Sequence, residues 1–268
     1  EMCIRDSVYT LELGLMDISE EEVVNELVPI VESYLNETLE IVSLKDSMHH
    51  LGYTSLVLKH QQNYSLQYGF QQYALEPLNC GDSFSAFHQD NLHYLALSDG
   101  MGQGKMAANE SKLTLEVLSK LILNGIGLKD TIDSINALLK IKNRNDMFTT
   151  LDLCNINLAN ARMKLIKYGA NPSYHIRSGM VEKIATNSLP VGVVSKLKMV
   201  SYEMPLKNND LIIMSSDGTG NDFEQIVNDN VHLYCDQHPQ EIATFLMDQV
   251  LEKNNLDDIS IIVIKAVS

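Results

Sequence analysis

Four aspartates in this sequence share one setting, in which an acidic side chain lies where an apolar stretch meets a turn. They are Asp82, Asp99, Asp217 and Asp257. Taken singly, each is weak evidence, because Asp is a common turn residue and most such turns carry out no chemistry. If the four stretches converge, their carboxylates form one anionic pocket that requires cations, since closely packed carboxylates cannot all stay ionised unaided.

Two features favour a functional site over four unrelated turns. The tripeptide Ser-Asp-Gly occurs at Ser98-Asp99-Gly100 and again at Ser216-Asp217-Gly218, each time directly after an apolar run. The first copy leads into Gly100-Met101-Gly102-Gln103-Gly104. Its glycines allow the backbone to approach a bound ion or phosphate closely. The repeated tripeptide and the glycines together predict a site that binds cations.

An all-oxygen ligand set of this kind selects hard ions such as Mg²⁺ or Mn²⁺, whereas zinc prefers His and Cys. Two such ions held ~3.5 to 4 Å apart can share a water, lower its pKa and orient it for attack on phosphorus. This chemistry needs no protein nucleophile, and no Cys-His or Ser-His-Asp spacing stands out in the sequence. The aspartates therefore predict metal-assisted hydrolysis of a phosphate ester.

The elements that would position these aspartates are short strands and two pairs of helices. Alternating or continuous apolar residues predict strands, and helical periodicity broken by Gly predicts helices. The predicted strands span 64–74, 83–87, 93–97, 149–156, 163–168, 173–177, 181–184, 199–204, 211–215 and 259–266, and the helices 105–123, 128–141, 222–228 and 239–252. Strand runs interrupted by paired helices predict an α+β fold of two packed sheets flanked by helices.

The first part of the chain has a different pattern. An acidic stretch at 18–22 predicts the start of a helix that continues to Leu35, and two strands follow at 39–44 and 54–58. Residues 1–7 resemble neither a signal peptide nor a continuation of the next element. We predict an N-terminal regulatory or linking segment over 1–62 and a catalytic domain over 63–268, the latter as the end of a longer, membrane-anchored protein.

Composition excludes several classes of partner. The 268 residues include 35 Asp and Glu against 20 Lys and Arg, for a formal charge of −15. This charge opposes binding to nucleic acid or to an anionic membrane surface. The longest apolar runs are far shorter than the ~20 residues of a membrane-spanning helix, and the four widely spaced cysteines favour a reducing, cytoplasmic setting. We therefore expect no nucleic-acid partner and no membrane contact from this chain.

Ordered motifs resemble the metal-dependent protein phosphatases of the PPM, or type 2C, class, in the bacterial branch typified by stage II sporulation protein E. They cover the chain from about Tyr64 to Ala266 in the order and spacing of that family. The matching stretches are Gly81-Asp82-Ser83, Ser98-Asp99-Gly100-Met101-Gly102, Phe148-Thr149-Thr150-Leu151-Asp152-Leu153, Gly169-Ala170-Asn171-Pro172, Leu189-Pro190-Val191-Gly192, Ser216-Asp217-Gly218 and Asp257-Asp258-Ile259-Ser260.

The resemblance implies a four-layer αββα sandwich of two antiparallel sheets, with two metal ions at one edge. Asp99 resembles the carboxylate that bridges both metals, and Gly100 resembles the residue that offers its backbone carbonyl. Asp82 is similar to a ligand of one metal, while Asp217 and Asp257 are similar to ligands of the other. We prefer Asp257 over the adjacent Asp258, whose position is often Asn in the wider family. The metals would activate water against phosphoserine or phosphothreonine.

By the same resemblance, the substrate would be a phosphorylated regulatory protein similar to an anti-anti-sigma factor, and the helices at 105–141 would form a regulatory switch. A helical pair that only packs on a sheet is the alternative for those helices. No arginine near 73–82 matches the phosphate-binding residue of eukaryotic members, and Thr219-Gly220-Asn221 departs from the family pattern. The alternatives to a phosphatase are a non-catalytic scaffold for a phosphorylated partner and another phosphoryl-transfer enzyme. A homodimer is compatible with the sequence.

Overall fold

The computed structural model describes residues 10–16, 18–35, 38–46, 53–61, 64–76, 79–102, 104–142, 148–234, 237–253 and 257–268. The chain divides into two compact units, Glu1–Asn63 and Tyr64–Ser268, which we call unit 1 and unit 2. The expectation for residues 1–7 lies outside the described residues. Unit 2 carries all four aspartates.

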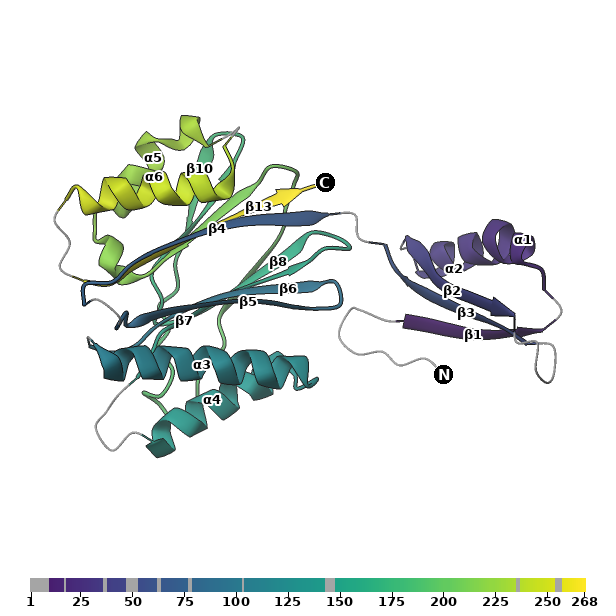
Figure 1. The fold of residues 1–268 in the computed structure, drawn as a ribbon, viewed down its shortest axis with the longest axis horizontal. Coiled ribbons are helices and arrows are strands. Elements are labelled where there is room, and N and C mark those ends of the chain that lie inside the picture. Colours follow the sequence, from purple (N-terminus) through teal and green to yellow (C-terminus); the bar gives the residue numbers. More distant parts are fainter. Residues whose placement is uncertain are drawn as a thin grey trace. The chain divides into compact units, whose positions relative to one another are not determined.

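Unit 2 is a sandwich of two antiparallel sheets with a helical pair on each outer face (Figure 1). One sheet has the order β10(Met180–Ile184), β9(Ser173–Arg177), β12(Leu211–Ser215), β13(Ile259–Val267), β4(Ser65–Tyr73). The other has the order β11(Ser201–Pro205), β8(Arg162–Tyr168), β7(Leu151–Asn157), β6(Leu92–Asp99), β5(Asp82–Gln89). The helices are α3(Lys105–Leu123), α4(Leu128–Lys142), α5(Phe223–Asp229) and α6(Pro239–Leu251). The predicted αββα fold is thus confirmed.

Alternation of side chains along the strands divides the core of unit 2 into three layers. On β7, Leu151 and Leu153 pack with residues of α3 and α4, whereas Cys154 and Ile156 belong to the layer between the sheets. Successive strand residues point to opposite faces, so Asp152 must also point between the sheets. In β13, residues of both faces are buried, which explains why that strand appears in the sequence as an unbroken apolar run.

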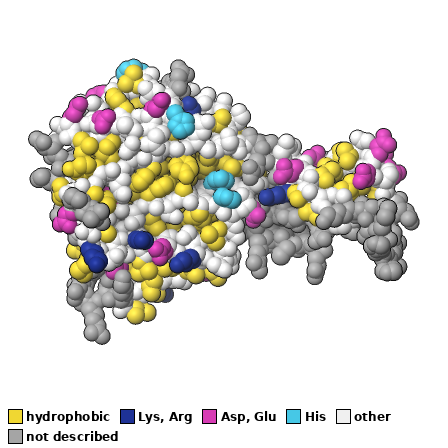
Figure 2. All heavy atoms as spheres, viewed as in Figure 1, with side chains coloured by type: hydrophobic (Ala, Val, Ile, Leu, Met, Phe, Trp, Pro, Cys, Tyr) yellow, Lys and Arg dark blue, Asp and Glu magenta, His cyan; other side chains and the backbone are white. Residues whose placement is uncertain are grey.

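Aromatic rings close one edge of the sandwich, where edge strands β4 and β5 lie. Phe70 of β4 and Phe84 of β5 are stacked with ring centroids 4.5 Å apart, and Tyr68 packs beside Phe84 at 6.0 Å. Figure 2 shows hydrophobic side chains across the middle of this face of unit 2. Offset aromatic pairs add to the free energy gained by burying their area, so these rings help to hold the two sheets together.

Most predicted element boundaries lie within two residues of the observed ones. The helix at 105–123 and the strands at 173–177 and 211–215 match their predicted limits. The strand predicted from residue 149 begins at Leu151, because Thr149 instead makes isolated bridges with Gly100 and Val191. That difference matters for the site, since Thr149 ties the turn after Asp99 to a loop from another part of the chain.

Unit 1 is a three-stranded antiparallel sheet covered by a short helical segment. Its elements are β1(Thr10–Met16), α1(Glu20–Glu22), the π-helical turn η1(Val23–Leu27), α2(Val28–Leu35), β2(Leu39–Asp46) and β3(Tyr53–His60), and the strand order is β1-β3-β2. Ser19 and Glu22 form a capping box, with the Ser19 amide donating to Glu22 at 2.9 Å, as expected for an acidic helix start. Sequence analysis missed β1, although Leu11, Leu13 and Leu15 alternate toward the core of this unit.

Within the ranges given above, no helix is long and apolar enough to span a membrane. Cys80 and Cys154 are free thiols, while Cys3 and Cys235 lie outside the described residues.

Candidate metal centre

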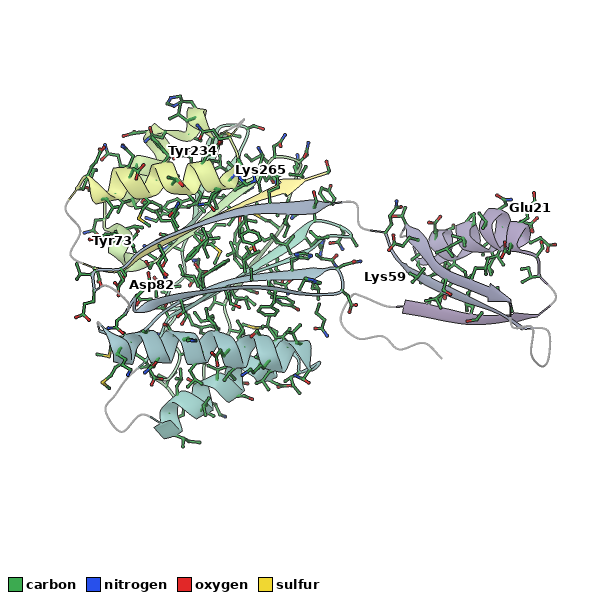
Figure 3. All side chains as sticks on the ribbon, viewed as in Figure 1. Glu21, Lys59, Tyr73, Asp82, Tyr234 and Lys265 are labelled. Carbon is green, nitrogen blue, oxygen red and sulfur yellow. The ribbon has the colours of Figure 1, made fainter. Side chains whose placement is uncertain are left out.

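The predicted ligands come from both sheets and meet at one end of the sandwich. Asp82 begins β5 and Asp99 ends β6, and the two residues are direct partners in the antiparallel ladder. Asp217 opens a short 3-10 turn, η2(Asp217–Thr219), which is separated from the end of β12 by one residue, and Asp257 lies just before β13. Figure 3 shows Asp82 at the end of its strand. The antiparallel topology therefore brings together residues that are up to 175 positions apart in the sequence, from Asp82 to Asp257.

Asp99 lies at the centre of this group. Burial, followed by the negative charges of Asp82 and Asp217 and then of Asp257, raises the pKa of the Asp99 carboxyl to about 9. These charges act more weakly the further away they lie, so their joint effect on Asp99 indicates that the four predicted ligands share one electrostatic environment. The Asp99 backbone is itself held, because its amide donates to the Thr150 hydroxyl at 2.9 Å.

Asp82 is the most buried of the four, with 4% of its surface exposed. Burial raises the pKa of its carboxyl to about 7, the Ser216 and Ser260 hydroxyls oppose this rise, and the charges of Asp217 and Asp258 add to it. Both carboxylate oxygens are buried without a hydrogen-bond partner of good geometry. An ionised carboxylate in this position is unstable unless a cation compensates it.

The donor set fits hard divalent cations. The four aspartates offer only carboxylate oxygens, which Mg²⁺ and Mn²⁺ prefer. Over the described part of the chain, no three His, Cys, Asp or Glu side chains lie in the geometry of a finished metal site. The orphaned oxygens of Asp82 and the raised pKa of Asp99 nevertheless indicate that this carboxylate cluster is adapted to positive charge. The assignment of individual ligands stays a prediction.

The adjacent acidic residues before β13 have different environments. Asp258 is buried and accepts hydrogen bonds from the backbone amides of Leu75 at 2.8 Å and Gly81 at 2.6 Å. Asp257 accepts from the Asp258 amide at 2.9 Å and contributes negative charge at Asp99. Asp258 thus anchors the loop that leads into Asp82, a role that sequence analysis missed, and Asp257 remains the predicted ligand.

Both Ser-Asp-Gly tripeptides need their glycine because another backbone passes directly over it. A Cβ atom on Gly100 would lie 2.1 Å from the carbonyl oxygen of Ala107 in α3, and one on Gly218 would lie 2.0 Å from the carbonyl oxygen of Asp258. Both distances are far inside van der Waals contact. The repeated tripeptide therefore reflects two close backbone crossings, each beside a predicted metal ligand.

We expect Gly218→Ala to lower the free energy of unfolding by about 3 kcal/mol, because overpacking at a fixed backbone contact forces the two loops apart. Gly179→Ala is the control, since a Cβ there meets nothing within 4 Å and the residue has φ +77°. That variant should lower the free energy of unfolding by only about 1 kcal/mol, because alanine is disfavoured in the left-handed backbone conformation of residue 179. Urea denaturation of both variants measures the difference, and equal losses would contradict the steric argument.

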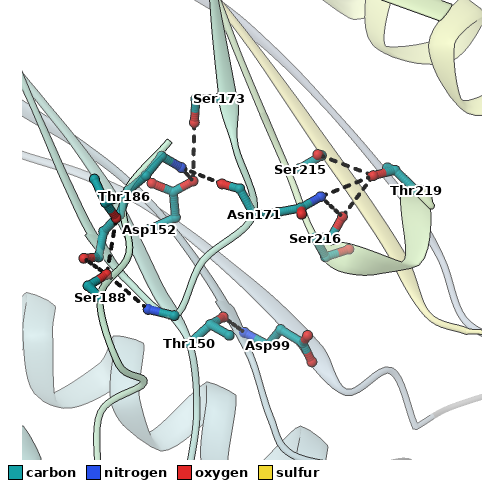
Figure 4. Close-up of polar contacts among 12 residues, drawn as sticks. Asp99, Thr150, Asp152, Asn171, Ser173, Thr186, Ser188, Ser215, Ser216 and Thr219 are labelled. Carbon is teal, nitrogen blue, oxygen red and sulfur yellow. Dashed lines mark hydrogen bonds and ion pairs between the residues drawn. The ribbon is translucent and has the colours of Figure 1, made fainter. Parts of the chain in front are cut away.

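A small pocket of about 130 Å³ lies beside the carboxylates, between the two sheets. Its walls include Asp99, Asp152, Asn171, Ser216 and Asp217. The polar contacts around it are drawn in Figure 4. The structure pairs the Asp152 carboxylate with Lys167 in the interior. Lys167 was missed as a candidate, because only its position opposite Asp152 on the neighbouring strand reveals the contact.

Comparison with known proteins agrees with this geometry. Residues 89–267 match the family described as Stage II sporulation protein E (SpoIIE). The chain is 30% identical over 278 residues to Stage II sporulation protein E of Bacillus subtilis (strain 168), a match that covers 96% of this chain and 33% of that protein. The chain therefore spans about a third of the length of this relative.

Two solved structures are informative. The PP2C phosphatase domain of SpoIIE from Bacillus subtilis, with a fragment of its regulatory domain, matches with a TM-score of 0.80 and 27% identity, covering 98% of this chain and 80% of that one. The catalytic domain of the serine threonine protein phosphatase PstP in complex with 2 manganese ions shares the fold, with a TM-score of 0.61, 20% identity and coverage of 77% of this chain and 100% of that one. The chain belongs to the SpoIIE family and has the PP2C phosphatase fold.

Proposed function

We propose that this chain is a metal-dependent protein serine/threonine phosphatase that hydrolyses phosphoserine or phosphothreonine through water activated by two Mn²⁺ or Mg²⁺ ions. The observation that carries the proposal is the convergence of desolvated carboxylates around Asp99, whose pKa burial and neighbouring charge raise to about 9. A folded protein gains nothing from such a cluster unless cations bind it. Family membership supports the same conclusion.

The position of each predicted ligand indicates its role at the two ions. Asp99 has Asp82 as its ladder partner and also feels the charges of Asp217 and Asp257, which suits a carboxylate that bridges two ions. Asp82 would hold one ion, and Asp217 and Asp257 the other, with the Gly100 carbonyl as a further ligand. When bound, the ions supply a water of lowered pKa and Lewis-acid stabilisation of charge at phosphorus. Asp99 and Asp217 are the residues on which we expect turnover to depend most.

The partner we propose is a phosphorylated regulatory protein similar to an anti-anti-sigma factor, with the enzyme acting in the cytoplasm. Asp217 is exposed at the mouth of the site, so a phosphorylated side chain on another protein can approach from solvent. The acidic character of the chain opposes nucleic acid as an alternative partner. We propose a regulatory or linking role for unit 1.

Hydrolysis of a phosphoserine peptide and of p-nitrophenyl phosphate, each with Mn²⁺, with Mg²⁺ and with excess chelator, tests this proposal. We expect turnover with either metal and loss to background with chelator, because the proposed nucleophile is a water that the ions activate. Equal turnover with and without chelator would contradict the proposal. Metal binding without any turnover would instead support the non-catalytic scaffold.

A further inference from the structure

A fully buried ion pair lies in the layer between the two sheets. Asp152 on β7 and Lys167 on β8 are cross-strand partners, and their side chains have 2% and 1% of their surface exposed. The Ser173 hydroxyl donates to the same Asp152 carboxylate at 3.3 Å. The pair lies on the inter-sheet face of its two strands, where Asp152 also lines the pocket described above, and both charges are almost fully withdrawn from water.

Stability alone does not explain this pair. Removing two charges from water costs about as much free energy as their attraction returns, so well-packed apolar residues are often as good or better. The pair does, however, provide a fixed donor. Lys167 Nζ also donates to the backbone carbonyl of Asn171 at 2.7 Å, in the loop that crosses from β8 in one sheet to β9 in the other. The ion pair therefore holds that crossing at Asn171.

The side chain of Asn171 continues the connection to the turn after β12. Its Nδ2 atom donates to the Ser216 carbonyl at 3.0 Å and lies 3.4 Å from the Thr219 hydroxyl, which itself donates to the Ser216 carbonyl at 2.9 Å (Figure 4). Residues 216–219 are thus tied together from inside the sandwich. Asp217 lies within this turn and is exposed, so its orientation depends on how firmly the turn is held.

We propose that the Asp152–Lys167 ion pair and Asn171 form a positioning device that fixes the 216–219 turn, and with it the Asp217 carboxylate opposite Asp99. The metal-related part of this proposal rests on the proposed function, in which Asp217 is a ligand. None of the three residues is itself a predicted ligand, so they are positioning residues. Partners that orient a metal ligand typically change metal affinity by about 10- to 100-fold when they are removed.

Two variants test the device. Asn171→Ala removes the contact to the turn, and the double variant Asp152→Leu/Lys167→Met removes the ion pair without leaving a buried charge unpaired. In metal-free protein we expect the amides of Thr219 and Gly220, which donate to Ser216 and Asp217, to exchange about tenfold faster in both variants. With Mn²⁺ alone, calorimetry should show binding weakened about tenfold.

The control breaks a different ion pair, which lies at the end of β12 opposite to the 216–219 turn. Arg177 donates to Asp210, the residue before β12, at 3.0 Å. Arg177→Gln should leave both the exchange of the 216–219 turn and Mn²⁺ affinity unchanged. A change of the same size in Arg177→Gln would overturn the proposal, because it would show that general loosening of unit 2 produces the effect.

Combining the variants tests whether the residues act as one device. Asn171→Ala in the Asp152→Leu/Lys167→Met background should weaken Mn²⁺ binding no further than the stronger parent variant does. Additive losses, or turn amides that exchange as in the wild-type protein, would overturn the proposal. A wild-type protein that binds Mn²⁺ but does not hydrolyse phosphoserine would defeat the proposed function alone, and the exchange result would still decide the positioning role.

Discussion

Asp99→Asn is expected to lower metal-dependent hydrolysis by about 1,000-fold or more and, in the presence of chelator, to make the protein more stable. The loss of activity follows from removing the carboxylate predicted to bridge both ions. The gain in stability follows from the pKa of Asp99, which burial and neighbouring charges raise to about 9 in the folded protein. Without metal, an amide avoids the cost of keeping a charge in this site.

The stability of the wild-type protein should depend on pH through Asp99. Asp99 ionises near its ordinary pKa in the unfolded chain but only near 9 in the folded one, so wild-type stability is lost as pH rises from about 4 to about 9. The advantage of the variant should therefore be absent near pH 4 and largest near pH 9, at about 2 kcal/mol after allowing for partial solvent exposure. Thermal unfolding in chelator across this range measures it.

Asp248→Asn provides the matched control for this experiment. Asp248 is exposed on α6, and the same substitution there should change neither activity nor the pH dependence of stability. Adding Mn²⁺ should raise the midpoint of thermal unfolding of the wild-type protein and of this control, and should have little effect on Asp99→Asn. An Asp99→Asn protein that is less stable than wild type in chelator at pH 9 would refute the electrostatic argument.

Lys167→Met alone is expected to lower the free energy of unfolding by about 3 to 5 kcal/mol, because it leaves the Asp152 carboxylate buried without its partner. Burial raises the pKa of Asp152, and the charge of Lys167 opposes that rise. Without the lysine, Asp152 must take up a proton in the folded protein or unfold the sandwich. Urea denaturation near pH 8 should show the loss most clearly.

The double variant Asp152→Leu/Lys167→Met should recover most of that stability, because two apolar side chains suit the inter-sheet layer. Its weaker Mn²⁺ binding would then occur in a protein of nearly normal stability, which separates positioning from folding. If the single and double variants were equally unstable, the unpaired charge would not be the cause of the loss.

Much of the fold could be predicted because its signals are local. Strands such as 211–215 and helices such as 105–123 show in their apolar periodicity, and Ser-Asp-Gly marks two strand ends by residue type alone. The αββα arrangement followed from the family resemblance and is confirmed. The short segment β1 was missed, because its alternation of Leu with Glu and Gly indicates a strand only once a sheet and a helix are present to cover it.

The remaining parts of the site depend on contacts between distant segments. Asp258 binds backbone amides 183 and 177 residues away, at Leu75 and Gly81, and nothing in its immediate sequence indicates those partners. Lys167 meets Asp152 because of the strand register, which the sequence of either strand alone does not specify. Tertiary contacts of this kind decide which of two adjacent aspartates is an anchor, and local patterns do not.

The backbone crossing at Gly218 has a consequence for how the site tolerates sequence change. Main-chain atoms of the turn after β12 lie against the main chain at Asp258, with no side chain between them. The separation between the turns that carry Asp217 and Asp257 is therefore set by the polypeptide backbone itself. Apart from Asn171 and the Asp152–Lys167 pair, surrounding side chains can change without altering that spacing. Mutational sensitivity at this end of the sandwich should therefore be concentrated in the glycine, the aspartates and those positioning residues.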